Sequence, residues 1–150
     1  MTPEQLGLGQ TNLRTLHLPR GFGTVGDRWF EESNIKQVII PNSVKGLGDW
    51  AFANCEQLRE VVFERDSRLE SIGDSCFINC RLASVVIPKS VRDIRGGAFY
   101  GCKSLSELSF EEGSKLSHVG VYAFDGTLLT PEQLQYPNAV EEDKSEDDLL

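Results

Sequence analysis

The sequence predicts a solenoid: an α/β-type, β-rich right-handed coil with a parallel sheet of about five short strands and short turns or 3-10 helices on the other side. Three observations support this fold class. Phenylalanines recur at spacings of 22, 25, 22 and 25 residues, an aliphatic residue lies five positions before each, and an apolar strand pattern lies upstream of each. Landmarks that stay in phase along a chain indicate stacked copies of one unit, each burying its apolar edge against its neighbours.

Length and composition allow one domain with a sizeable core, since the chain has 150 residues, of which 39% are hydrophobic and 25% charged. A net charge of -8 and the lack of a Lys/Arg cluster argue against nucleic-acid binding. No apolar run approaches the roughly 18 residues of a membrane-spanning helix, and residues 1–30 lack the basic-then-apolar pattern of a signal peptide. The compartment stays open between the cell surface and the cytoplasm.

Each unit is expected to form one short strand followed by a core wall. The landmark phenylalanines are Phe30, Phe52, Phe77, Phe99 and Phe124. Five positions earlier lie Val25, Leu47, Ile72, Ile94 and Val119, and three positions later lie Ser33, Cys55, Cys80, Cys102 and Thr127. The strand positions are Leu13/Leu16/Leu18, Ile35/Val38/Ile40, Leu58/Val61/Phe63, Leu82/Val85/Ile87 and Leu105/Leu108/Phe110. The second and third apolar residues of each strand are two positions apart, so both point inward, and the phenylalanine packs from the opposite wall.

The repeat has a double step of 47 residues, as the separations of Phe30 from Phe77 and of Phe52 from Phe99 show. Short coils turn after the strand through PNSVKG or PKSVRD, and long coils turn through ERDSRLES or EEGSKLSH, which adds two residues. The link from phenylalanine to the next strand alternates between five and six residues, which supplies the third of the three residues by which the two spacings differ. Two slightly different coils therefore alternate along the stack.

The unit 82–105 has the pattern L-x-x-V-x-I-P-x-S-V-x-x-I-x-x-x-A-F-x-x-C-x-x-L and resembles the BspA-type leucine-rich repeat. The resemblance covers about residues 13–127; the first unit is degenerate, with Trp29 before Phe30 and Ser33 at the cysteine position. Arg95 replaces the glycine that is usual in the family, which suggests a locally altered turn. The resemblance implies a leucine-rich-repeat solenoid that serves as a binding or adhesion module and has no catalytic residues.

The two ends differ from the repeats at 13–129. Residues 1–12 are polar and glycine-rich and are expected to cap the first coil. Residues 130–140 begin with Thr-Pro-Glu-Gln, a pattern typical of a helix start, and are expected to form a C-terminal cap. Residues 141–150 predict an acidic disordered tail, with an acidic partner-binding tail as the alternative.

The cysteines favour a structural role. Cys55, Cys80 and Cys102 share one repeat position, and Cys76 takes the place of an alanine in the other coils, so we expect buried thiols that act as small hydrophobes. A metal site and a disulfide between stacked neighbours are the less favoured alternatives, because the spacing of Cys76 and Cys80 differs from that of most zinc sites. No cofactor and no metal are expected.

The sequence offers no catalytic constellation. No base can be placed beside a serine or cysteine from spacing, and His118 lies in a turn. The segment GFGTVG at 21–26 lacks the lysine and the βαβ context of a phosphate-binding loop. We therefore expect no enzymatic activity.

The strand phase predicts a binding face. Residues between the inward positions point outward, so Ile39, Val62 and Val86 should form an aliphatic stripe, with His17 in the same column. The acidic border of this stripe consists of Glu60, Glu64, Glu107 and Glu111. A contiguous apolar stripe favours a partner surface, whereas the general preference of β-branched residues for strands is the competing explanation.

The predicted function is a non-enzymatic protein-protein interaction or adhesion module that binds a protein partner through the exposed face of its parallel sheet. The alternative is a structural or spacer segment of a longer repeat array with no partner of its own. Neither a nucleic-acid ligand nor a membrane span is expected. The sequence leaves the partner's identity and the oligomeric state open.

Overall fold

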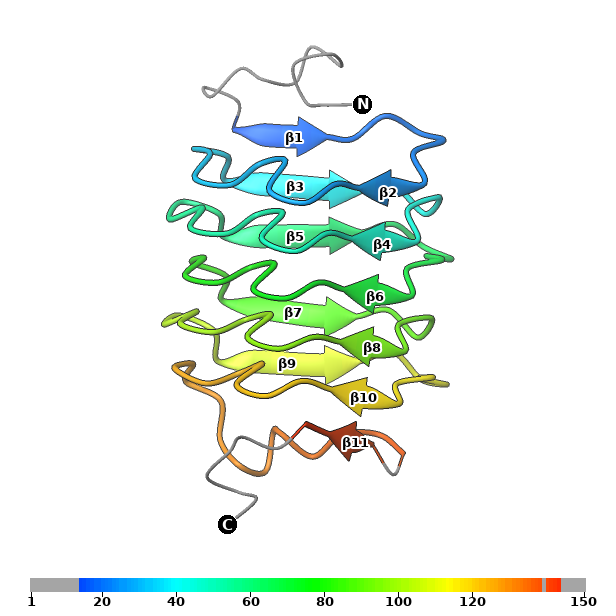
Figure 1. Cartoon of the computed structure of the whole chain (residues 1–150), viewed down its shortest axis with the longest axis vertical. Coiled ribbons are helices and arrows are strands. Elements are labelled where there is room, and N and C mark those ends of the chain that lie inside the picture. Colours follow the sequence, from blue (N-terminus) through cyan, green and yellow to red (C-terminus); the bar gives the residue numbers. More distant parts are fainter. Residues whose placement is uncertain (1–13, 139, 144–150) are drawn as a thin grey trace.

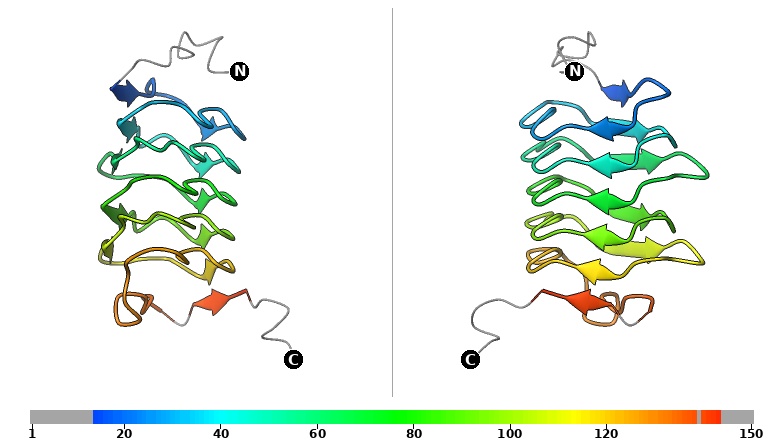
Figure 2. Two further views of the ribbon diagram at one scale, coloured as in Figure 1. Left: turned by 90° about the vertical axis from the view of Figure 1, so that its left-hand side faces the viewer. Right: turned by 45° about the vertical axis from the view of Figure 1, so that its right-hand side comes forward.

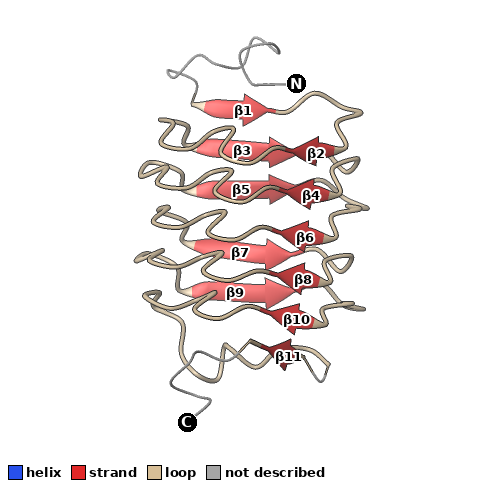
Figure 3. Cartoon of the chain, viewed as in Figure 1, coloured by secondary structure: helices blue, strands red, loops and turns tan. Residues whose placement is uncertain are grey.

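The computed structural model describes residues 14–138 and 140–143, so the predicted N-terminal cap at 1–12 lies outside the described residues. The described chain winds into a β-solenoid of about six turns whose strands are all parallel to their neighbours (Figure 1). Within these residues the connections are turns and loops, so the 3-10 helices offered as an alternative are not formed (Figure 3). None of the described residues belongs to a helix suited by length and hydropathy to cross a membrane.

The predicted parallel sheet is present but interrupted. Its strands are β1 (Thr15–His17), β3 (Gln37–Ile40), β5 (Glu60–Phe63), β7 (Ser84–Ile87) and β9 (Glu107–Phe110). Strand pairing joins β1, β3 and β5 into one sheet and β7 with β9 into another. Figure 1 shows β5 and β7 farther apart than the other neighbours in this wall. The expectation of one continuous five-stranded sheet is therefore wrong at this step.

A second parallel sheet forms the other wall, which the sequence did not predict (Figure 2). Its six two-residue strands are β2 (Thr24–Val25), β4 (Gly46–Leu47), β6 (Ser71–Ile72), β8 (Asp93–Ile94), β10 (His118–Val119) and β11 (Glu141–Glu142). In β2, β4, β6, β8 and β10 the second residue is the aliphatic that precedes each phenylalanine by five positions, and it is buried. Two residues are too few to show the alternation by which a strand is recognised in a sequence.

The landmark phenylalanines form one continuous file through the core. Adjacent rings stack with centroids 5.4, 5.3, 5.3 and 5.2 Å apart from Phe30 to Phe124. The three central rings, Phe52, Phe77 and Phe99, are fully buried. This confirms the prediction that the five phenylalanines pack in line inside the solenoid, with each coil contributing one ring.

The repeated cysteines also form a file, as expected. The thiols of Cys55, Cys80 and Cys102 each donate to a phenylalanine carbonyl in an earlier coil at an Sγ–O distance of 3.1 Å. All four cysteines are buried and free, so the alternative of a disulfide is not realised. Burial raises the pKa of the Cys102 thiol to about 12, which keeps it protonated and able to donate.

Close stacking of the backbones beside β6 leaves no room for a side chain at Gly73. A Cβ placed on Gly73 would lie 2.6 Å from the carbonyl carbon of Gly48 and 2.7 Å from the amide nitrogen of Asp49. Arg95 occupies the equivalent position in the next coil, and its N–H still donates to the Ile72 carbonyl at 2.9 Å. The departure from the family pattern therefore leaves the hydrogen bond between the coils intact.

The C-terminal end closes the stack as a sixth, partial coil. Thr130 and Gln133 exchange backbone-to-side-chain hydrogen bonds in a capping box, but the segment makes a single turn instead of a helix. Tyr136 packs its ring against Phe110 and Phe124, with centroids 6.1 and 6.2 Å away. The ring thus covers the last phenylalanine of the file.

Residues 141–143, which the sequence placed in a disordered tail, are structured. Glu141–Glu142 form β11, which pairs with β10, and the carboxylate of Asp143 lies 2.7 Å from Nε2 of His118. The opposite ring nitrogen, Nδ1, lies 2.7 Å from the carboxylate of Asp93, which also pairs with Arg95 at 3.3 Å. Acidic composition suggested disorder, yet backbone pairing and one histidine hold this segment.

We expect the attachment of β11 to weaken as pH rises. Hydrogen bonds to the carboxylates of Asp143 and Asp93 raise the pKa of His118 above its usual 6.5. The folded-state pKa is raised, so the stabilisation is complete below about pH 6.5 and is lost as pH rises through the raised value. Hydrogen exchange at the Asp143 amide, which donates to the Val119 carbonyl, should therefore gain an extra acceleration as pH rises above about 6.5.

His118→Gln is the control for this pH effect, because it removes the titrating group and leaves the rest of the strand unchanged. In this variant the Asp143 amide should follow the intrinsic pH dependence of exchange alone. The same pH profile in parent and variant would refute the role of His118.

Candidate binding surface

The predicted outward column lies on the exposed face of the first sheet. His17, Ile39 and Val62 are direct partners in the registers β1–β3 and β3–β5. Val86 faces the same way on β7 and is 54% exposed, whereas Ile39 and Val62 are half-buried. His17 is exposed on β1, two strands away from β5. The stripe therefore exists, but a step between Val62 and Val86 interrupts it.

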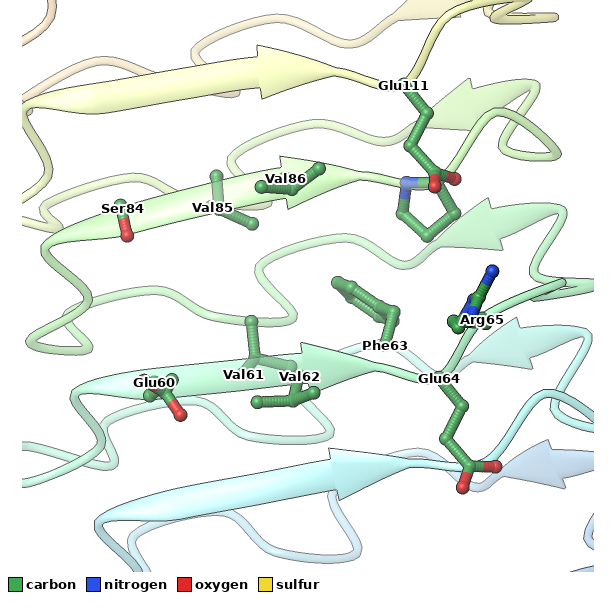
Figure 4. A pocket seen from close by; sticks show the side chains of 11 residues that line it. Glu60, Val61, Val62, Phe63, Glu64, Arg65, Ser84, Val85, Val86 and Glu111 are labelled. Atoms are coloured by element: carbon green, nitrogen blue, oxygen red, sulfur yellow. The ribbon is translucent and has the colours of Figure 1, made fainter.

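This step is a groove with a volume of about 360 Å³ between β5 and β7. Figure 4 shows Val62 and Val86 on its two walls and the ring of Phe63 between the two strands. Val61, Val85 and Pro88 complete the apolar part of the lining. Such a volume accommodates one or two side chains of a partner, at the small end of the range for ligand pockets.

The groove opens where a long coil meets the following short coil. Phe63 holds the third apolar strand position, at which the neighbouring short coils have the buried residues Ile40 and Ile87. The Phe63 ring is only half-buried, since its bulk does not fit the width of an isoleucine column. Pro88, at the end of β7, has no N–H to donate to β5. Both features work against pairing of the two strands.

The predicted acidic border lies around the groove in part, and its members also have structural roles. The Glu64 carboxylate accepts a hydrogen bond from the Asn42 amide at 3.0 Å and pairs with Arg20 at 3.6 Å. The Glu111 carboxylate accepts from the Lys89 amide at 2.9 Å. These two long-coil glutamates thus fix the turn of the preceding short coil. Both carboxylate oxygens of Glu64 have partners, whereas Glu111 uses only one of its two for this hydrogen bond.

The other two glutamates are less constrained. Glu60 lines the groove and accepts a hydrogen bond from the side chain of Gln37. Glu107 is exposed beside Ser84 in the β7–β9 register and does not line the groove. The border is not purely acidic, because Arg65 also contributes to the lining.

Sequence reasoning missed Phe63 as a surface residue, because the repeat assigns its position to the core. The available signal was the substitution of phenylalanine for isoleucine in alternate coils, at Phe63 and again 47 residues later at Phe110. At Phe110 the equivalent space is covered by Tyr136. The groove beside Phe63 is left open.

The described residues hold no cluster of three or more histidine, cysteine, aspartate or glutamate side chains arranged for a metal ion. The four thiols are buried. The arrangement of the groove, an apolar floor with charged side chains around it, is suited to binding a partner's side chains.

A family model described as "BspA type Leucine rich repeat region (6 copies)" matches residues 8–106. Proteins with leucine-rich repeats of this kind are typically interaction or adhesion modules and are typically not enzymes. No curated protein matches the chain.

Solved structures with the same fold come from bacteria. The pneumococcal vaccine antigen PcpA is 21% identical, with a TM-score of 0.73 over 78% of this chain and 33% of its own. A leucine rich cell surface protein from Faecalibacterium prausnitzii is 23% identical, with a TM-score of 0.52 over 78% of this chain and 40% of its own. This chain thus spans less than half of either structure, and identities this low establish the fold alone.

Proposed function

This chain belongs to the BspA-type leucine-rich-repeat family, and on that premise we propose that it is a non-enzymatic module that binds a protein partner through the exposed face of β1, β3, β5, β7 and β9. The observation that carries this proposal is the groove between β5 and β7. Its apolar walls, Val62 and Val86, are two of the three members of the stripe that strand phase alone had indicated. A regular sheet would give a flat face, whereas a groove gives a place for an inserted side chain.

The charges around the groove favour a partner with basic residues. Glu60, Glu64 and Glu111 contribute three carboxylates against the single guanidinium of Arg65. An aromatic or large aliphatic side chain next to lysine or arginine would fill the apolar part and pair with these carboxylates. Association should accordingly slow as ionic strength rises, because salt screens charges that attract across solvent.

Val86→Glu is expected to weaken partner binding at least about tenfold, since it adds a charge at the wall of the groove. Because Val86 is 54% exposed, the variant should unfold within about 0.5 kcal/mol of the parent. Proteins captured on the immobilised chain are identified by mass spectrometry, and their affinities for parent and variant are then measured by calorimetry. Val62→Glu should act in the same direction but disturb folding more, since Val62 is half-buried.

Leu128→Glu is the matched control, because Leu128 is 62% exposed in a turn outside the sheet face. It introduces the same charge, and binding should be retained. Equal affinities of the parent and Val86→Glu for every captured protein would refute the sheet face as the binding surface. Complete lack of specific capture would favour the spacer role instead.

A further inference from the structure

A second apolar hollow lies outside the first sheet, on the turns that connect the second sheet to the phenylalanine file. Its volume is about 320 Å³. It is lined chiefly by Ser75, Gly96, Gly97, Tyr100, Val121 and Tyr122. Tyr100 and Tyr122 are 45% and 51% exposed, which places two of the most exposed large hydrophobic side chains of the described residues on one small area.

Small residues in the middle of a column create this hollow. The position two residues before each landmark phenylalanine holds Arg28, Trp50, Ser75, Gly97 and Tyr122 in successive coils. Adjacent coils are joined here by backbone hydrogen bonds, such as that from the Gly97 N–H to the Val121 carbonyl at 2.9 Å. The small residues Ser75 and Gly97 therefore leave a shallow floor between the aromatic side chains of Trp50 and Tyr122.

Tyr122 occupies a backbone conformation that a side chain disfavours. Its φ is 60°, in the left-handed region where glycine is the natural choice. Trp50 shares this conformation, but its ring contacts the Arg28 guanidinium at 5.0 Å and is half-buried. Gly97 shows that the position does not require an aromatic residue for folding. Arg28, Trp50, Ser75 and Gly97 share this positive φ at the same position of their coils, so the conformation is a property of the repeat. The fold does not require an exposed aromatic side chain at Tyr122, which leaves that side chain available for recognition.

The hollow is uncharged in a chain whose surface is strongly acidic. Every residue that lines it is neutral, whereas the whole chain has 15 basic and 23 acidic residues. In the first coils, by contrast, the side chains of Asp27 and Asp49 each accept an N–H from the following coil. Gly96 and Val121 replace this aspartate in the last two coils. The last carboxylate of this column, that of Asp74, borders the hollow beside Gly96 without lining it. The lining itself is neutral, which favours an uncharged ligand.

We propose that this hollow binds a proline-rich peptide segment of another protein in the polyproline II conformation. Such segments are extended before binding, have no internal hydrogen bonds and dock on aromatic-lined grooves. Proline rings pack against tyrosine faces, and the two phenol hydroxyls can donate to the exposed peptide carbonyls. A sugar fits less well, because the lining offers few polar side chains to replace the water bound to its hydroxyls. This site does not depend on the sheet face.

The test is a titration of the full ¹⁵N-labelled chain with acetylated, amidated decaproline, followed by amide NMR. The amides of Gly96 and Gly97 should shift on addition of decaproline and stay in place with a glycine-serine peptide of equal length. Tyr122→Gly should weaken decaproline binding about tenfold or more. The same variant should melt within about 3 °C of the parent, because glycine suits the positive φ.

Val86→Ser, on the sheet face, is the matched control and should bind decaproline as the parent does. The proposal fails if Gly96 and Gly97 do not respond to decaproline, or if Tyr122→Gly binds it with unchanged affinity. It also fails if the shifts centre on Val62 and Val86. A response of the glycine amides to maltohexaose but not to decaproline would make the hollow a carbohydrate site and overturn the peptide proposal.

Discussion

Phe77→Ala is expected to lower the free energy of unfolding by about 3 to 5 kcal/mol, the range for a fully buried phenylalanine. The Phe77 ring stacks on Phe52 and on Phe99 with centroids 5.3 Å away on both sides, and it is fully buried. Removing it leaves a cavity in the middle of the file. The backbone hydrogen bonds between neighbouring coils fix their spacing, so the coils cannot move together to fill that cavity. The loss should be measured by urea unfolding monitored by circular dichroism.

Phe63→Ala is the matched control, because it removes the same atoms from a half-buried position. Its cost should be clearly smaller than that of Phe77→Ala, since less apolar surface returns to water. Equal costs for the two variants would contradict the assignment of Phe77 to the continuous file and of Phe63 to the groove.

Gly73→Ala is expected to destabilise the stack by about 1 to 3 kcal/mol or more, although it adds only one methyl group. The new Cβ would lie 2.6 Å from the carbonyl carbon of Gly48, a backbone atom that cannot rotate aside as a side chain can. Coils two and three would have to separate locally, which weakens the β4–β6 pairing. Thermal unfolding and amide exchange at β6 should both report the loss.

Gly23→Ala is the matched control for this substitution. A Cβ at Gly23 has no heavy atom within 4 Å, and its φ lies outside the positive region. The variant should therefore be unchanged or gain a few tenths of a kcal/mol from the restricted unfolded chain. If Gly73→Ala and Gly23→Ala have the same melting temperature, close stacking of the glycine backbones is not the reason that position 73 needs glycine.

The core could be predicted because every coil repeats it. The fivefold recurrence of Phe52 and Cys55 and their equivalents identified both files, and burial of apolar residues at fixed positions is the strongest constraint on a stacked unit. The face of the first sheet followed from the same register, because residues alternate across a strand. The predictions succeeded at repeat positions where every coil places the same physical requirement, such as burial, on the residue.

The features missed by the sequence depend on differences between coils. The groove arises because Phe63 and Pro88 stand on adjacent strands, which a pattern averaged over units does not show. The hydrogen bonds of Glu64 and Glu111 to backbone amides join residues 22 positions apart, so spacing along the chain gives no sign of them. The hollow at Tyr122 depends on exposed turn positions, where folding places few demands on residue type.

The alternation of two kinds of coil has a consequence for how such a molecule can lengthen. Because Phe63 and Phe110 are 47 residues apart, duplication of a coil pair would preserve the phase of the stack and add one more opening of the Phe63 kind. Successive openings would lie two coils apart, roughly 10 Å along the axis. Growth by pairs would therefore multiply equivalent docking points in a row, and affinity for a repetitive partner would rise through avidity without any new kind of contact.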